Sequence, residues 1–119
     1  MQLRELKKYL DIDVEGSLAD RFMDNEALYT RFLRKLLDSQ DFELLEQALA
    51  AEDYEELLRR AHNLKGVCAN LGLNGLSTSF ALLVQKLRNG CKEQAALEST
   101  VAQLHAEWSK TLQCIGELC

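Results

Sequence analysis

The combination of residues best suited to chemistry in this chain is a histidine followed by a lysine and a glycine: His62, Lys65 and Gly66. A neutral imidazole nitrogen is a competent nucleophile near pH 7. A lysine three positions later on a helix lies one turn away, where its ammonium group can offset negative charge on a reactant. The spacing therefore predicts a nucleophile beside a cation, on a helix whose outer face carries the histidine.

The segment 53–71 is expected to form that helix. Asp53 followed by Glu56 resembles a capping box at its start. At about 100° per residue, the apolar side chains gather on one side, which must face the core. That side consists of Leu57, Ala61, Leu64, Val67, Cys68 and Leu71. His62 points almost opposite to their centre, so we predict that it is exposed.

The outer face of the same helix also carries Leu58, Arg59, Ala69 and, four positions after the histidine, Gly66. A glycine within a helix costs roughly 1 kcal/mol relative to alanine. Gly66 is a tolerated surface glycine, a point of close approach for a neighbouring helix, or a clearing that lets a reactant or another protein reach the imidazole. The residues alone leave these three interpretations open.

The elements that must position this face follow from apolar spacing. Helical segments are predicted over residues 2–10, 17–23, 25–37, 41–49, 53–71, 74–89 and 93–118. Ser17 and Asn74 are candidate N-caps, and Gly90 ends the helix that Asn74 begins. The last helix has an apolar stripe with alternating steps of four and three, as in antiparallel bundles. We predict an all-α fold: an antiparallel four-helix bundle with short additional N-terminal helices.

Composition agrees with this fold and limits the function. The 119 residues include no proline and are rich in good helix formers, and this length has room for one domain over residues 1–119. The net charge of −5 argues against a nucleic-acid binder, whose affinity comes mostly from Lys and Arg on phosphates. The length and the lack of a glycine-rich phosphate loop argue against a kinase with its own nucleotide.

Neither the N-terminal residues nor any later stretch has the composition of a targeting or membrane segment. The longest uncharged stretch, residues 66–85, has too many polar side chains to span a bilayer. The four cysteines show no CxxC spacing, which favours reduced thiols in a cytoplasmic protein. Cys68 is expected in the core and Cys119 as a free terminal thiol.

The residues around the histidine resemble the signature of histidine-containing phosphotransfer (HPt) domains. The resemblance is carried by the segment Ala61-His62-Asn63-Leu64-Lys65-Gly66, then Asn70-Leu71-Gly72 and Leu76. Upstream, Leu18, Arg21-Phe22, Tyr29, Phe32-Leu33 and Leu36 look like the lead-in helices of the family. The resemblance covers most of the chain and implies a phosphocarrier in a two-component phosphorelay.

The resemblance also implies roles for individual residues. His62 would accept a phosphoryl group from the aspartyl phosphate of a receiver domain and pass it to another receiver aspartate. Lys65 would stabilise the phosphoryl charge, with Arg59 contributing at longer range. The chain would need no cofactor and have no autokinase activity, since Mg²⁺ would arrive in the acidic pocket of the receiver. A hybrid histidine kinase is a further expected partner, and a monomer is the expected state.

A receiver helix is expected to dock on an apolar surface around the histidine that includes Leu58, Arg59, Ala69 and Leu73, with Gly66 giving access. The uncharged stretch offers small residues that would let two helices pack closely there: Ala69, Gly72, Gly75, Ser77 and Ser79. The other interpretation of residues 72–75 is a tight turn between helices, which is compatible with the first.

One position departs from the family pattern. Family members often carry Gln or Glu 22 residues after the histidine, within reach of the ring, whereas this chain has Val84 there and Gln85 beside it. Either Gln85 orients the ring after a small rotation, or water or a backbone group does so.

Two rival functions are compatible with a small helical domain of this kind. A helical adaptor could bind receivers or other signalling proteins without phosphorylation. The dimerisation domain of a histidine kinase usually has an acidic residue directly after its histidine, whereas Asn63 stands here.

His105 lies at the edge of the last apolar stripe without Lys or Gly at matching offsets, and we interpret it as a boundary residue. Neither histidine has the Glu three positions before it that a di-iron bundle would require, so no metal site is expected.

Overall fold

A computed structural model of the protein describes residues 1–118 and has no strand in that range. Its elements are the 3₁₀ helix η1 (Leu3–Lys8), α1 (Val14–Arg21), α2 (Glu26–Lys35), the 3₁₀ helix η2 (Leu36–Asp38), α3 (Asp41–Ala50), α4 (Tyr54–Asn70), α5 (Asn74–Arg88) and α6 (Gln94–Gly116). The predicted all-α fold is confirmed. The prediction for the thiol of Cys119 lies outside the described residues.

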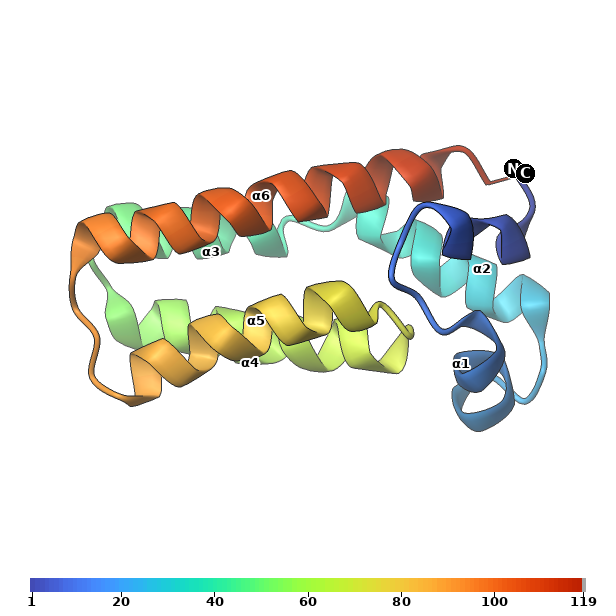
Figure 1. Ribbon diagram of the computed structural model, residues 1–119, viewed down its shortest axis with the longest axis horizontal. Helices are drawn as coiled ribbons and strands as arrows, with labels where there is room; N and C mark the ends of the chain where they lie inside the picture. Colours follow the sequence, from blue (N-terminus) through green and yellow to red (C-terminus); the bar gives the residue numbers. More distant parts are fainter. Residues whose placement is uncertain (119) are drawn as a thin grey trace.

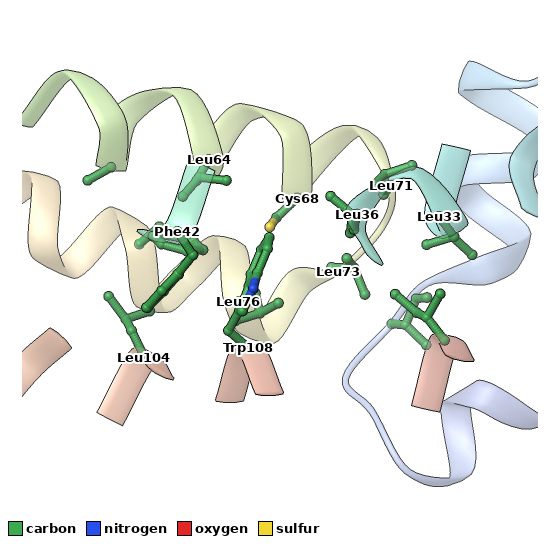
Figure 2. Packing of buried hydrophobic residues seen from close by; sticks show 14 of the residues in the cluster. Leu33, Leu36, Phe42, Leu64, Cys68, Leu71, Leu73, Leu76, Leu104 and Trp108 are labelled. Carbon is green, nitrogen blue, oxygen red and sulfur yellow. The ribbon is translucent and has the colours of Figure 1, made fainter. Parts of the chain in front are cut away.

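Helices α3 to α6 form a bundle in which successive helices run in opposite directions (Figure 1). Helix α6 is the longest and extends past the bundle to reach the N-terminal elements. Its predicted apolar stripe is buried from Leu97 to Leu118. The aromatic rings of Phe42, Phe80 and Trp108 meet in the core, with centroids 5.5 to 6.3 Å apart. Figure 2 shows Phe42 and Trp108 among the leucines of the surrounding helices.

Helix α4 begins where the sequence predicts. The side chain of Asp53 accepts a hydrogen bond from the backbone N–H of Glu56 at 3.2 Å. The predicted core face of α4 is buried, except that Val67 is only half-buried because it borders an open groove described below. The helix ends before Gly72, whose φ of +73° lies in the left-handed region that glycine tolerates best.

The N-terminal elements form a separate layer against the end of α4 (Figure 1). Asp13 donates its backbone N–H to the carbonyl of Gly72 at 2.8 Å, and the Tyr29 hydroxyl donates to the carbonyl of Leu71 at 2.6 Å. The Ser17 hydroxyl donates to the carbonyl of Asn70 at 3.4 Å. Carbonyls at a helix C-terminus lack partners within the helix, so α1 and α2 supply them and fix the end of α4.

The N-caps predicted at Ser17 and Asn74 are wrong, in contrast to the one at Asp53. The cap of α1 is Asp13, whose carboxylate accepts from the N–H of Gly16 at 3.0 Å, while Ser17 is buried inside the helix. Helix α5 has Leu73 at its N-cap position and no side-chain cap; the N–H of Gly75 donates to the Asp11 carbonyl at 3.2 Å instead. In α1 a different local residue provides the cap, whereas in α5 a contact distant in sequence replaces it.

Helices α4 and α5 pack closely, as expected, and Ser77 of α5 reaches the backbone of α4, but Gly72 and Gly75 have a different role. A Cβ on Gly72 would lie 2.5 Å from the backbone oxygen of Asp13, and a Cβ on Gly75 would lie 3.1 Å from Cβ of Asp11. These glycines therefore admit the segment that leads into α1. They do not bring α4 and α5 together.

Candidate functional site

His62 lies in the middle of α4 and is exposed, as predicted, while its neighbours Ala61 and Leu64 are fully buried. Its imidazole makes no hydrogen bond, ion pair or ring contact with any other residue of the range 1–118. Buried flanking residues fix the helix, so the histidine backbone is rigid while its ring is open to a reactant.

The position of Gly66, on the next turn of α4, is open. A Cβ built at this position meets no atom within 4 Å. The interpretation that Gly66 admits a neighbouring helix is therefore wrong. The glycine leaves the outer face of α4 low at the point where a partner would approach His62.

The charge near His62 differs from the sequence expectation. Arg59 and Arg60 both bind the carboxylate of Glu56, and Arg60 also lies 3.7 Å from a carboxylate oxygen of Asp41. Hydrogen bonds from Arg59 and then Arg60 lower the pKa of Glu56, so this carboxylate stays charged and offsets the guanidinium groups. The longer-range contribution expected of Arg59 is thereby weakened.

Lys65 is the cation best placed beside the histidine. It is half-buried, one turn from His62, and has no carboxylate partner among residues 1–118. Its backbone carbonyl accepts a hydrogen bond from the Ser77 hydroxyl of α5 at 3.3 Å, which ties this turn of α4 to the bundle. The ammonium group is free to pair with an incoming anion.

Of the predicted docking residues, the structure places Arg59 and Ala69 on the exposed face of α4, and Leu58 half-buried beside them. The prediction for Leu73 is wrong. Only 2% of Leu73 is exposed, because the left-handed turn at Gly72 directs the chain inward and Leu73 packs in the core (Figure 2).

The orientation of the His62 ring, by Gln85 or by water or a backbone group, stays a prediction. Val84 is buried in the core at 3% exposure, so the usual position of the polar residue faces inward. Gln85 is exposed, and within residues 1–118 it makes no hydrogen bond to His62.

The other reactive residues are not brought to the site. Burial raises the pKa of the Cys68 thiol to about 12, which makes it an unreactive core residue. The ring of His105 packs edge-on against Phe42 and its Nδ1 lies 3.3 Å from a carboxylate oxygen of Glu46. In the range 1–118 no three His, Cys, Asp or Glu side chains cluster in a way that could hold a metal ion.

One surface was missed by sequence reasoning. An open cavity of about 560 Å³ lies between α1, α2, the start of α3 and the flank of α4 that carries Val67 and Asn70. We call it the aromatic groove; it is lined by Arg21, Phe22, Phe32, Lys35, Leu36, Ser39, Asp41, Val67, Asn70 and Leu71. A signal existed in the apolar segment 25–37, which has more apolar residues than one helical stripe can bury, and Phe32 and Leu37 are indeed exposed.

Comparison with known proteins identifies the class. The family model described as Hpt domain, the histidine-containing phosphotransfer domain, matches residues 28–113, and the chain belongs to this family. Neither the curated proteins nor the solved structures yielded a match. HPt domains are phosphocarriers that interact with receiver domains, so this chain has a phosphotransfer-related role in two-component signalling. Among residues 1–118 no helix is long and apolar enough to cross a membrane.

Proposed function

We propose that His62 accepts a phosphoryl group from the aspartyl phosphate of one receiver domain and passes it to the aspartate of another. The observation that carries the proposal is the exposed, unpartnered imidazole on α4, with the open position of Gly66 and the unpaired Lys65 on adjacent turns. These three residues lie inside the segment that matches the family model.

The unprotonated ring nitrogen attacks phosphorus in line with the bond that breaks. A P–N bond forms as the P–O bond to the receiver aspartate breaks, and the electron pair leaves on that carboxylate. Lys65 offsets the negative charge on the phosphoryl oxygens during the transfer. The second transfer is the same exchange in reverse, with a different aspartate as acceptor.

The chain supplies the nucleophile and one cation, while the receiver supplies the remaining charge. Glu56, the acidic residue nearest to Arg59 and Arg60, is engaged by both, so it is not available to hold Mg²⁺ beside His62. A divalent cation therefore belongs in the acidic pocket of the receiver. The chain itself has no autokinase activity under this proposal and gains no label from ATP alone.

Transfer of label tests the proposal. Receivers of the source organism are phosphorylated with radiolabelled phosphate and mixed with the protein; the label is expected to appear on it as an acid-labile, base-stable phosphate. His62→Gln should abolish uptake, whereas His105→Gln is the matched control and should leave it unchanged. If no receiver transfers label to the unsubstituted protein, the carrier function is overturned.

Binding without transfer would instead identify the adaptor function, in which the same surface holds a receiver and no phosphoryl group moves. The kinase dimerisation domain is less well supported, because α3 to α6 complete a four-helix bundle within one chain. We further propose a cytoplasmic monomer that also receives phosphoryl groups from the receiver of a hybrid kinase. Sedimentation of the purified protein tests the monomeric state.

A further inference from the structure

The aromatic groove is built in part from residues outside the matched family segment. Arg21 and Phe22 precede residue 28, where the match begins, yet they form one wall of the groove. The opposite wall is the flank of α4 that carries Val67 and Asn70. The N-terminal elements thus add a concave surface to the helix that carries His62.

The groove has an aromatic floor and a positive rim. The rings of Phe22 and Phe32 lie 5.5 Å apart, and Phe32 is 40% exposed. Nζ of Lys35 lies 4.5 Å from the centroid of the Phe32 ring. Arg21 has no carboxylate partner in the range 1–118. This rim contrasts with the net charge of −5 carried by the whole chain.

The one acidic residue in the lining is already engaged. A carboxylate oxygen of Asp41 lies 3.7 Å from Arg60, and the other accepts a hydrogen bond from the Ser39 hydroxyl at 3.2 Å. The groove therefore favours an apolar side chain that is flanked by negative charge, since an aromatic floor and two free cations complement that combination.

The groove lies within reach of a partner docked on His62. Along a helix with 1.5 Å rise, Val67 is about 7.5 Å and Asn70 about 12 Å from the histidine. Asn70 is rotated from His62 by about 80° and Val67 by about 140°, so the groove begins on the outer face at Asn70 and extends toward the core-facing side of α4. A partner that buries about 800 Å² of this protein covers both places at once.

The backbone beside the groove is held in an uncommon conformation. Met23 and Asp24 have φ values of 50° and 59°, and Met23 is 86% exposed. The N–H of Asp24 donates to the Leu18 carbonyl at 2.7 Å, and that of Asn25 donates to the Phe22 carbonyl at 2.9 Å. Left-handed backbone positions are strained in residues other than glycine, and such strain concentrates at functional sites.

We propose that the aromatic groove is a second docking site for the receiver domain and selects which receivers reach His62. The occupant is an apolar side chain on an acidic helix of the receiver, seated on Phe32 between Arg21 and Lys35. The inference rests on the proposed function, because the receiver is the partner that must cover His62.

Binding to receivers that transfer label tests the groove. Phe32→Ala is expected to weaken receiver affinity at least about tenfold, as for an aromatic residue at the centre of an interface. Lys35→Glu should slow association and reduce its dependence on salt. Leu82→Ala, at a position 54% exposed on α5, and Lys92→Glu, before α6, are the matched controls and should leave affinity unchanged.

Chemical phosphorylation distinguishes a defect in docking at the groove from a defect in the chemistry at His62. Phosphoramidate is a small donor that needs no docking, so Phe32→Ala and Lys35→Glu should take up phosphoryl groups from it at the rate of the unsubstituted protein. If receivers transfer phosphoryl groups to both variants as fast as to the unsubstituted protein, the groove is not a docking site. His62 would still be the carrier in that case. A concentration-dependent dimer that Phe32→Ala abolishes would assign the groove to a second copy and would also overturn the inference.

Discussion

The bundle of α3 to α6 and the N-terminal layer before it share one apolar core but differ in the polar contacts that they add to it. The bundle buries continuous apolar stripes and a cluster of three aromatic rings. The N-terminal layer also buries apolar side chains, such as Leu6, Leu18 and Leu33. It adds polar contacts in which Asp13, Ser17 and Tyr29 donate to the carbonyls at the end of α4. The histidine lies on the helix that both regions share. The bundle makes that helix rigid, and the N-terminal layer determines what lies beside its C-terminal end.

Truncating a bundle ring should have the largest effect on stability. Phe80 is fully buried, so Phe80→Ala is expected to lower the free energy of unfolding by about 3–5 kcal/mol through lost burial and a residual cavity. Phe32→Ala, in the N-terminal layer, should cost under about 1.5 kcal/mol because its ring is partly in water already. Urea denaturation of both variants measures the difference; equal losses would contradict this comparison.

Each region has one buried group that makes the protein sensitive to alkali. Burial raises the pKa of Cys68 in the bundle from 9.0 to about 12, and that of Tyr29 in the N-terminal layer from 10.0 to about 12. Both are neutral when protonated, so their stabilising effect is complete below the unfolded pKa and is lost as pH rises toward 12. The free energy of unfolding should therefore fall from about pH 9 upward.

A cysteine variant divides this pH effect between the two regions. Cys68→Ala removes the bundle contribution, so the decline in its unfolding free energy should begin about one pH unit higher, where free tyrosine ionises. Denaturation series between pH 7 and 11 provide the measurement. A variant with the same pH profile as the unsubstituted protein would show that Cys68 is not protected in the folded state.

Removing one hydroxyl should loosen the N-terminal layer alone. Tyr29→Phe leaves the Leu71 carbonyl without its 2.6 Å donor and is expected to cost about 1–2 kcal/mol. Amide hydrogen exchange should accelerate between residues 70 and 75 while the core of α5 and α6 stays protected. Faster exchange throughout the bundle would show that the two regions unfold as one unit.

Gly66→Ala has the smallest expected effect, and it should raise stability while it lowers the rate of transfer. Gly66→Ala should stabilise α4 by about 0.5–1 kcal/mol, because the added methyl group meets no neighbour and alanine is the better helix former. The same methyl group should slow transfer from a receiver by narrowing access to His62. Thermal unfolding and the transfer assay measure the two effects; faster transfer in the variant would contradict the access role.

The sequence was sufficient for whatever depends on helical periodicity. The spacing of Leu57, Ala61, Leu64 and Cys68 located the core face of α4, and the exposure of His62 followed from it. The long stripe of the last helix was likewise predicted residue by residue. In these cases burial is a property of one helix, and a single period describes it.

Prediction failed where contacts join residues that are distant in sequence. Ser17 looked like a cap but bonds to Asn70, and Leu73 looked like a surface residue but turns inward after Gly72. A local contact was also missed, since Glu56, three residues before Arg59 on the same helix, binds its guanidinium group. The aromatic groove combines side chains from α1, α2 and α4, so no local pattern could have outlined it.

The two ends of the described chain meet at one corner of the molecule (Figure 1). The terminal ammonium group of Met1 donates to the carbonyl of Glu117 at 2.8 Å, and Arg34 donates to the carbonyl of Leu118 at 3.1 Å. A short linker could therefore join the ends, and the chain could be reopened in the exposed connection after Gly90 with every helix kept in place. Such a circular permutant would begin with α6 and carry the histidine helix near its C-terminus. The helices would then build the same surface although they are synthesised in a different order.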